Sequence, residues 1–248
     1  MLIDGAWCWV STHGEFVGGG DLPALFLDRD NLLIADPGFI HDPADVVLLA
    51  GASRLVRLAN DLGIPVIVTT NQSGIGRGYY DWDAFAAVNA RLLQLLAESG
   101  AAIDAIVGCG WHRSARDEPG GRSHPWRKPQ AGMMLECRTR FGIDLERSWM
   151  VGDRWSDMRA ARAGGLAGGL LVRGGDGFAE RPMRAIHRLR ARRDTKALFR
   201  CYRVASIDEV LDTAQRLFGL IGAAGWARRD GALRAITRSG SALHESRT

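Results

Sequence analysis

The sequence has few cysteines and no long apolar run. Its 248 residues include four cysteines, Cys8, Cys109, Cys137 and Cys201, scattered without the spacing of a disulfide framework. Such sparse cysteines suit a reducing cytoplasm, and we expect the protein there. No apolar stretch approaches the length of about 20 residues that a membrane-spanning helix needs. Met1–Gly20 also lacks the basic start and apolar core of a signal peptide. These absences argue against a membrane or secreted protein.

Charge is unevenly distributed along the chain. Residues 1–172 contain 16 Lys or Arg and 20 Asp or Glu, a net charge of −4, whereas residues 173–248 contain 16 and 8, a net charge of +8. The arginines between positions 181 and 193 have almost no aromatic neighbours, so a stacking platform for single-stranded nucleic acid is poorly supported. We expect this basic third to be solvated surface, and nucleic acid is not the favoured partner.

Short apolar runs alternate with helical patterns through most of the sequence. This alternation is typical of a parallel α/β sheet, and we expect a Rossmannoid three-layer sandwich with a mostly parallel sheet. Only about ten residues separate Asp30 from the turn at Asp42-Pro43, which is too few for a helical cap, so we expect no large cap domain. Strands are predicted at Ala24–Leu27, Pro65–Thr69, Ala105–Gly108, Trp149–Val151 and Gly169–Val172, and helices at Gly51–Leu62, Asp83–Ser99, Gln130–Phe141 and Trp155–Ala163.

We expect one domain with an extension at each end. Residues 1–20 form an N-terminal extension, in which Trp7, Trp9 and Val10 could form an edge strand. Residues 21–222 form the domain, with the chemical motifs within 25–172 and a basic part at 173–222. A capping box at Ser206–Glu209 predicts a helix that closes the domain, with the apolar face Val210, Leu211, Ala214, Leu217 and Phe218. Residues 223–248 are polar and basic, and we expect a disordered tail.

Asp28 and Asp30 directly follow the apolar run Ala24–Leu27. Ligands and catalytic groups of α/β sheets gather at the carboxyl ends of the strands. Of two carboxylates there, one can attack phosphorus while the other transfers a proton, and both can lie beside one Mg2+. Taken alone, the pair is more typical of an ordinary turn.

The predicted strand Pro65–Thr69 leads into Thr70 and a polar run. A hydroxyl and successive backbone N–H groups at this point would bind a phosphate oxygen, although an ordinary polar turn explains the same residues. The following Gly74–Gly78 lacks both the ending of a P-loop and the spacing of a dinucleotide loop. We interpret it as a flexible turn, with Arg77 as a candidate substrate contact.

The third motif is Arg127-Lys128-Pro129, which stands just before a predicted helix. A cationic pair there would neutralise the charge that develops on a transferred phosphoryl group. A generic basic turn would also explain these residues.

The fourth motif places Asp153 directly after the predicted strand Trp149–Val151. Asp153 could bind a metal, and Asp157, one helical turn later, fits an outer role. Asp153 as a helix N-cap is the simpler alternative. The occurrence of all four motifs in this order is nevertheless improbable by chance.

Taken together, the four motifs resemble the haloacid dehalogenase (HAD) superfamily, and specifically its phosphatases. The likeness covers Leu25–Val172, about 60% of the chain. Thr70–Gly78 and Arg127-Lys128-Pro129 are similar to the branch of heptose bisphosphate and histidinol-phosphate phosphatases. The acidic motifs are shared across the superfamily.

The resemblance implies a role for each of these residues. Asp28 would be the nucleophile that forms an aspartyl-phosphate, and Asp30 would protonate the leaving oxygen and then activate water. Thr70 would hold the phosphoryl group, and Lys128 would stabilise its charge. Mg2+ would be held by Asp28, Asp153 and the backbone carbonyl of Asp30. Substrate contacts would fall on Asp36, Gly38, Phe39, Asn71, Gln72, Ser73, Arg127 and Arg154.

The chain departs from the family pattern at several positions. Asn31 stands where a Gly usually follows the second Asp, and Ile34 stands where the substrate loop usually has Asn. The family often carries a structural zinc with four Cys or His ligands before Arg-Lys-Pro. This chain offers three, and Trp126 replaces the last cysteine, so zinc has little support. The three candidate zinc ligands are Cys109, His112 and His124.

The resemblance implies Mg2+-dependent hydrolysis of a small phosphorylated sugar by a monomer. Heptose 1,7-bisphosphate is the leading substrate, and histidinol phosphate is second. A polynucleotide 3′-phosphatase is a third hypothesis, motivated by the basic C-terminal residues, and its activity would fall steeply with salt. A hypothesis from another class is an inactive binding protein with the same fold. The complete set Asp28, Asp30, Thr70, Lys128 and Asp153 argues against inactivity.

Overall fold

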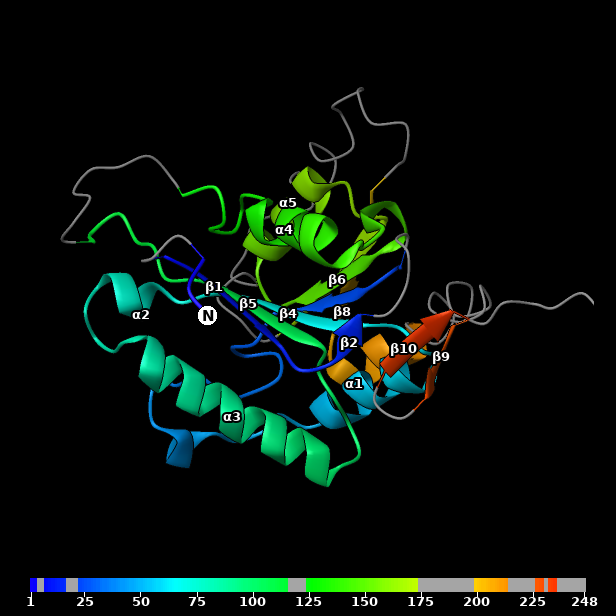
Figure 1. Ribbon diagram of the computed structural model, residues 1–248, viewed down its shortest axis with the longest axis horizontal. Helices are drawn as coiled ribbons and strands as arrows, with labels where there is room; N and C mark the ends of the chain where they lie inside the picture. The colour runs from blue at the N-terminus through cyan, green and yellow to red at the C-terminus, as the bar shows by residue number, and fades with distance from the viewer. Residues whose placement is uncertain are drawn as a thin grey trace, which may run out of the picture.

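A seven-stranded sheet forms the centre of the molecule (Figure 1). The computed structural model describes residues 1–3, 7–16, 22–115, 124–173, 199–213, 226–229 and 232–235. Within these residues the strand order of the main sheet is β1-β5-β4-β3-β6-β7-β8. All neighbouring strands are parallel except β1, which is antiparallel to β5. The strands are β1 (Cys8–Thr12), β3 (Leu25–Leu27), β4 (Val66–Asn71), β5 (Ala105–Cys109), β6 (Trp149–Gly152), β7 (Gly168–Val172) and β8 (Arg200–Val204).

Helices cover both faces of this sheet. In Figure 1, α1 (Ala52–Asp61) and α3 (Trp82–Glu98) lie below the sheet, and α4 (Gly132–Phe141) and α5 (Trp155–Gly164) lie above it. The predicted three-layer α/β sandwich is therefore confirmed. Between Asp30 and α1, the described chain forms loops and one 3-10 turn, η1 (Pro43–Asp45), without a helical cap. A second 3-10 turn, η2 (Leu145–Arg147), precedes β6.

The two faces of the sheet bury separate apolar clusters. Successive side chains of a strand point to opposite faces. Leu25 and Leu27 of β3 accordingly pack with residues of α1 and α3, whereas Phe26 packs with Met133 and Met158 of α4 and α5. All three β3 side chains are fully buried. A central strand of a parallel sheet is apolar along its whole length because helices cover both faces of the sheet.

The register of the three central strands determines where their polar ends lie. Leu27 of β3 lies opposite Val68 of β4 on one side and Val151 of β6 on the other. The chain leaves β3 toward β4 and later returns on the opposite side as β6, so the strand order reverses beside β3. Such a reversal is the usual ligand-binding point of an open α/β sheet. Asp28, Thr70 and Asp153 are therefore brought to one edge.

The elements predicted from the central residues are present with small shifts of their bounds. Helix α3 begins at Trp82, because the side chain of Asp81 accepts a hydrogen bond from the backbone N–H of Ala84 (2.9 Å) and caps the helix. Strand β8 was not predicted. Most of its residues are exposed, and it carries Arg200 and Arg203, as edge strands often do. Strand β8 therefore lacks the unbroken apolar run that marks the buried strands of this sheet.

The predicted C-terminal helix is present in part. Residues 207–213 are helical, and the backbone N–H of Glu209 donates to Ser206 Oγ (3.3 Å). The side chain of Glu209 reaches back to the N–H of Ala205 (2.6 Å) instead of Ser206, so the capping box is displaced by one residue. Ala214, Leu217 and Phe218 lie outside the described residues.

The stretch interpreted as a flexible turn after β4 contains a short helix, α2 (Ser73–Gly76). Its glycines are required by close packing. A Cβ on Gly74 would overlap the ring of Tyr80, and one on Gly76 would lie 2.7 Å from the carbonyl oxygen of Gly110. The glycines thus serve tight packing of this turn against its neighbours.

The N-terminal extension contributes β1 to the main sheet, in line with the predicted edge strand. Trp9 stacks on Trp82 with ring centroids 5.5 Å apart and meets Phe85 edge-on at 5.9 Å. Both partners belong to α3. The extension is therefore packed against the helix that covers one face of the domain.

A small second sheet pairs a strand near the N-terminus with two strands of the C-terminal part. Its order is β2-β10-β9, formed by Glu15–Phe16, Ala232–Ala235 and Trp226–Arg229. The expectation of a disordered tail does not hold for these two C-terminal strands, whose backbone groups are paired in the sheet. The rest of 223–248, and 174–198 of the basic part, lie outside the described residues. No helix in the described ranges is long and apolar enough to cross a membrane.

We expect Trp9→Ala to lower the free energy of unfolding by about 2–3 kcal/mol. This is less than the 3–5 kcal/mol typical of a fully buried aromatic residue, because Trp9 is only partly buried. Chemical denaturation would measure the change. Val47→Ala is the control, since Val47 is 60% exposed, and its effect should stay within about 0.5 kcal/mol. An unchanged stability of Trp9→Ala would show that β1 does not support the domain.

Candidate active site

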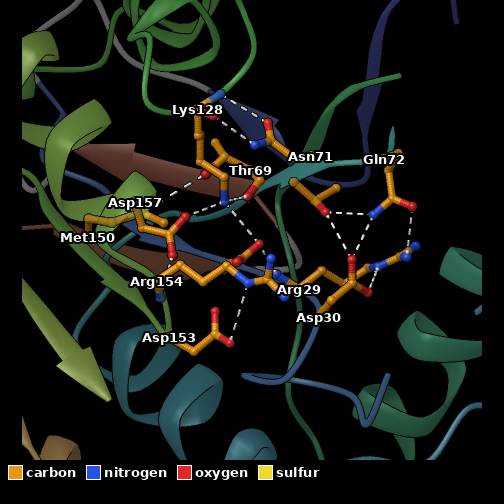
Figure 2. A network of polar contacts seen from close by, with 12 residues as sticks. Arg29, Asp30, Thr69, Asn71, Gln72, Lys128, Met150, Asp153, Arg154 and Asp157 are labelled. Carbon is orange, nitrogen blue, oxygen red and sulfur yellow. Dashed lines mark hydrogen bonds and ion pairs between the residues drawn. The ribbon is translucent and has the colours of Figure 1, made fainter. Parts of the chain in front are cut away.

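A buried lysine joins two carboxylates at the carboxyl edge of the sheet (Figure 2). Lys128 Nζ lies 2.9 Å from Asp28 Oδ1 and 2.6 Å from Asp157 Oδ1, and it donates to the carbonyl oxygen of Thr69 at 2.8 Å. The three partners come from the end of β3, from α5 and from β4. All three ammonium hydrogens of Lys128 are therefore matched by oxygen atoms.

The charges in this cluster shift one another's pKa values. Burial opposes the charge of Lys128, but Asp157 and Asp28 outweigh it and raise the pKa of Lys128 above its ordinary value. Burial raises the pKa of Asp28 strongly, and the charge of Lys128 counteracts part of that increase. Nearby Asp157 and Asp153 push the pKa of Asp28 further up. The ammonium group is thus held charged beside an excess of carboxylates.

Asp153 is the group in this cluster whose charge is least compensated. It is fully buried, and neither carboxylate oxygen has a hydrogen-bond partner within the described residues. Its ion pair with Arg154 Nε is long, at 3.9 Å. Burial, with a smaller contribution from Asp157, raises the pKa of Asp153 to about 6. An ionised, buried carboxylate that has no hydrogen bond and one long ion pair is stabilised by a further cation.

The oxygen atoms around Asp153 fit Mg2+. One ligand atom each from Asp28, Asp153 and Asp157 lies within 4.8 Å of the others, and this is the group of metal-ligand side chains found in the described ranges. Carboxylate oxygens are the ligands that Mg2+ prefers. Asp157 uses Oδ1 for Lys128 and Oδ2 for the N–H of Arg154 (3.0 Å). The contacts of Asp28 with Lys128 and with the N–H of Arg29 both fall on Oδ1, so Asp28 Oδ2 and Asp153 are the available ligand atoms. The sequence assigned Asp157 an outer role, and these contacts fit it.

The side chain of Asp30 contacts residues outside the group of Asp28, Asp153 and Asp157. Its Oδ1 accepts from Arg29 Nε (2.8 Å), and its Oδ2 accepts from Gln72 Nε2 (2.8 Å) and Thr70 Oγ1 (3.3 Å). The Asp30 side chain is therefore not part of the metal group. The predicted metal contact of Asp30 involved only its backbone carbonyl and stays a prediction.

Asn71 positions the loop that carries Lys128. Its Nδ2 donates to the backbone carbonyl of Lys128, and its Oδ1 accepts from the backbone N–H of the same residue, both at 2.9 Å. Both polar atoms of the Asn71 side chain are thus engaged by the protein. The side chain therefore holds Lys128 in place, and the predicted substrate contact of Asn71 stays a prediction.

A cavity of about 740 Å³ opens above these residues. All of the predicted site residues line it except Thr70 and Asp153, which are fully buried. The sequence did not identify several lining residues as part of a site. These are Arg29, Ile40, Tyr80 and Ser156, together with Asn31 and His112, which drew attention for other reasons.

The loop after Asp30 has an unusual backbone conformation. Asn31 has φ 59 and Phe39 has φ 59, both in the left-handed region. Asn tolerates that region better than other side chains, which explains why it can replace the glycine usual in this family. Asp36 Oδ1 accepts from the N–H groups of Gly38 (3.0 Å) and Ile40 (3.1 Å) and so fixes the far end of the loop.

One wall of the cavity is cationic. Arg77 Nη2 lies 3.1 Å from His112 Nε2, and Arg127 Nη1 donates to the carbonyl oxygen of Trp111 at 3.0 Å. Burial lowers the pKa of Arg127, and the charges of Arg77 and Arg154 add to that decrease. Burial and the neighbouring arginines likewise lower the pKa of His112. Positive groups therefore repel one another here, as in a site prepared for an anion.

The three candidate zinc ligands do not form a closely spaced metal group in the described residues. His112 is engaged by Arg77. His124 lies between two thiols, with Nε2 3.9 Å from Cys8 Sγ and Nδ1 3.8 Å from Cys109 Sγ. The structure gives zinc no support.

Comparison with known proteins agrees with this geometry. A family model described as HAD-hydrolase-like matches residues 125–190. A D-glycero-beta-D-manno-heptose-1,7-bisphosphate 7-phosphatase from Mesorhizobium japonicum is 46% identical over 180 residues, which cover 71% of this chain and 83% of that protein. The chain belongs to the HAD-like phosphatases. A heptose bisphosphate 7-phosphatase from Thermosynechococcus vestitus is 40% identical over 161 residues, or 62% of this chain and 81% of that one.

Solved structures of HAD-like phosphatases have the same fold. A HAD-like phosphatase from Mesorhizobium loti has a TM-score of 0.70 and 38% identity, over 90% of this chain and 96% of that one. A D,D-heptose 1,7-bisphosphate phosphatase from B. bronchiseptica, complexed with magnesium and phosphate, has a TM-score of 0.62 and 23% identity, over 79% and 99%. The second likeness is one of fold alone.

We expect Asp153→Asn to stabilise the metal-free protein at pH 7.5 by on the order of 1–3 kcal/mol. The native pKa of Asp153 is raised from 3.8 to about 6, so the folded state binds the proton more tightly than the unfolded state. Its charge therefore destabilises the native state above pH 6, and the effect disappears as the pH falls below the unfolded value. Urea denaturation at pH 7.5 and at low pH measures this difference.

Magnesium should stabilise the wild-type protein at pH 7.5 and have little effect on Asp153→Asn. The control is Asp61→Asn, because Asp61 is 69% exposed and pairs only with Arg57 on the surface. An Asp153→Asn variant that is less stable than the metal-free wild type would contradict the assignment of Asp153 as an uncompensated metal ligand.

Proposed function

We propose that the protein is a Mg2+-dependent phosphatase that removes the 7-phosphate of D-glycero-D-manno-heptose 1,7-bisphosphate. The observation that carries the proposal is the contact of the buried Lys128 ammonium with Asp28, next to the Asp153 carboxylate, which has no hydrogen-bond partner in the described residues. This arrangement suits a carboxylate nucleophile, a cation for phosphoryl oxygens and a metal. The names of the similar phosphatases support the choice of sugar.

In this proposal the reaction has two steps. A carboxylate oxygen of Asp28 attacks phosphorus, the bond from phosphorus to the sugar oxygen breaks, and Asp30 gives that oxygen a proton. Asp30 then takes a proton from water, which attacks phosphorus of the aspartyl-phosphate and frees phosphate and Asp28. Lys128 compensates negative charge on the phosphoryl oxygens in both steps. Bound by Asp28 and Asp153, Mg2+ would supply further positive charge to these oxygens.

The cationic wall supports a substrate with a second phosphate. Arg77 and Arg127 line the same cavity as Asp28 outside the Lys128 cluster, and Arg154 lines it beside Asp153. A cavity of about 740 Å³ lies within the range of about 300–1,000 Å³ usual for small-molecule sites. We infer that one phosphate of the sugar bisphosphate lies at Asp28 and the other at this wall. The four cysteines form no disulfide with one another, which supports a cytoplasmic location.

The proposal predicts fast phosphate release from the heptose bisphosphate in the presence of Mg2+. The test is a panel that also contains histidinol phosphate and 3′-phosphorylated DNA, with wild type and Asp28→Asn assayed side by side. Asp28→Asn should reduce release to background, because it lacks the nucleophile, while the protein stays folded. Preferred turnover of histidinol phosphate would replace the sugar assignment, and turnover of DNA that falls with salt would favour the polynucleotide hypothesis.

We expect Arg77→Ala to raise KM for the sugar bisphosphate by about 10–100-fold, the effect of losing one charge-assisted hydrogen bond. The kcat and KM for a sugar monophosphate should change little, because Lys128 and Asp28 are untouched. Steady-state kinetics on both substrates measure the difference. Arg91→Ala, at a partly exposed position of α3, is the matched control. Equal effects of Arg77→Ala on the two substrates would exclude a role in binding the second phosphate.

A further inference from the structure

Arg29 is a large charged side chain in the core, and no role was predicted for it. It is 1% exposed, although it stands between two acids at a strand end. Arginine is almost never fully buried unless its donors are matched. The guanidinium group must therefore be tied to specific acceptors, and these acceptors indicate what the residue does.

Each arm of the guanidinium group has a different partner. Arg29 Nε donates to Asp30 Oδ1 (2.8 Å), Nη2 donates to Gln72 Oε1 (3.1 Å) and Nη1 donates to Asn89 Oδ1 (3.0 Å). The group lies over the ring of Phe85, with Cζ 5.2 Å from its centroid. A planar fork of this kind fixes direction as well as charge. Figure 2 shows Arg29 between Asp30 and Gln72.

The contact with Gln72 sets the orientation of a second amide. Gln72 Oε1 accepts from both Arg29 and the hydroxyl of Tyr80 (2.5 Å). Its Nε2 must then face the other way, where it donates to Asp30 Oδ2 (2.8 Å) and Thr70 Oγ1 (2.6 Å). Arg29 thus binds one oxygen of Asp30 directly and the other through Gln72.

The contacts of Arg29 and Gln72 converge on the carboxyl group of Asp30. All three residues line the cavity, but the Asp30 side chain is 20% exposed, whereas Arg29 and Gln72 are buried. A carboxyl group has about four lone-pair positions. Arg29 takes one on Oδ1, and Gln72 and Thr70 take two on Oδ2, so one position on Oδ1 remains for the proton that is given to the leaving oxygen. These contacts therefore restrain the carboxyl group without blocking proton transfer.

We propose that Arg29 is a positioning residue that, with Gln72, holds the Asp30 carboxyl group in the orientation needed to protonate the leaving oxygen. The inference rests on the proposed function, because it takes Asp30 as the acid. When the phosphorus–oxygen bond to the leaving group breaks, the proton passes from Asp30 to that oxygen. In this role Arg29 acts through Asp30.

The test compares leaving groups. An alkyl phosphate needs a proton on its departing oxygen, whereas p-nitrophenyl phosphate needs little help. In Arg29→Lys we expect kcat/KM for the alkyl phosphate to fall by about 10²–10⁴-fold, the usual contribution of an acid catalyst, and that for p-nitrophenyl phosphate to fall far less. Lysine keeps the charge but cannot bind Asp30 and Gln72 together. Asp30→Asn should show the same selective loss.

Two further variants keep the test decisive. Tyr80→Phe removes only the second donor to Gln72, and it should give a smaller loss with the same preference for the alkyl phosphate, even if Arg29→Lys fails to fold. Arg57→Lys, at a position 61% exposed, should change neither rate. Circular dichroism and thermal unfolding establish which variants are folded.

The outcomes distinguish a failure of the positioning role of Arg29 from a failure of the proposed phosphatase activity. Equal losses on both substrates in folded Arg29→Lys or Tyr80→Phe, with an active wild type, would overturn the role of Arg29 and leave the proposed function intact. Wild-type protein that releases no phosphate from either compound would overturn the proposed function, and the role of Arg29 with it. A selective loss on the alkyl phosphate supports the role.

Discussion

The contact of Lys128 with three oxygen atoms is the interaction on which the site depends. It joins the end of β3, through Asp28, to β4, through the Thr69 carbonyl, and to α5, through Asp157. These segments are far apart in sequence and meet because the sheet order reverses beside β3. The backbone of Lys128 is in turn held by two hydrogen bonds with the side chain of Asn71. A buried cation with three partners keeps a group of carboxylates together that would otherwise repel one another.

The same cluster has an excess of negative charge that a bound cation would compensate. One ammonium faces Asp28, Asp153 and Asp157, and the oxygens of Asp153 have no hydrogen-bond partner in the described part of the chain. The raised pKa of Asp153 expresses this imbalance. A fold optimised for stability alone would have paired or removed that carboxylate.

The sequence predicted the central fold and most of the site because both follow from local patterns. Apolar runs that end in acids mark β3 and β6, and their carboxyl ends must share an edge in a parallel sheet. Strand β8 was missed because its exposed, charged residues carry no such pattern. The orientation of Asn71 and the burial of Arg29 depend on partners distant in sequence. One signal was present: Asn89 interrupts the apolar stripe of α3, where a buried amide implies a polar partner.

Strand β1 supports the site by packing, although it contains none of the four sequence motifs. Its Trp9 meets Phe85 edge-on, and Phe85 carries the guanidinium group of Arg29 on its ring face. A shortened protein that began after Thr12 would keep the acids of the site, the lysine and the threonine, and Trp82 would still meet Phe85, yet it would lose the second ring, that of Trp9. The packing behind Arg29 therefore extends beyond the segment in which the signature residues occur, and it includes the first strand of the chain.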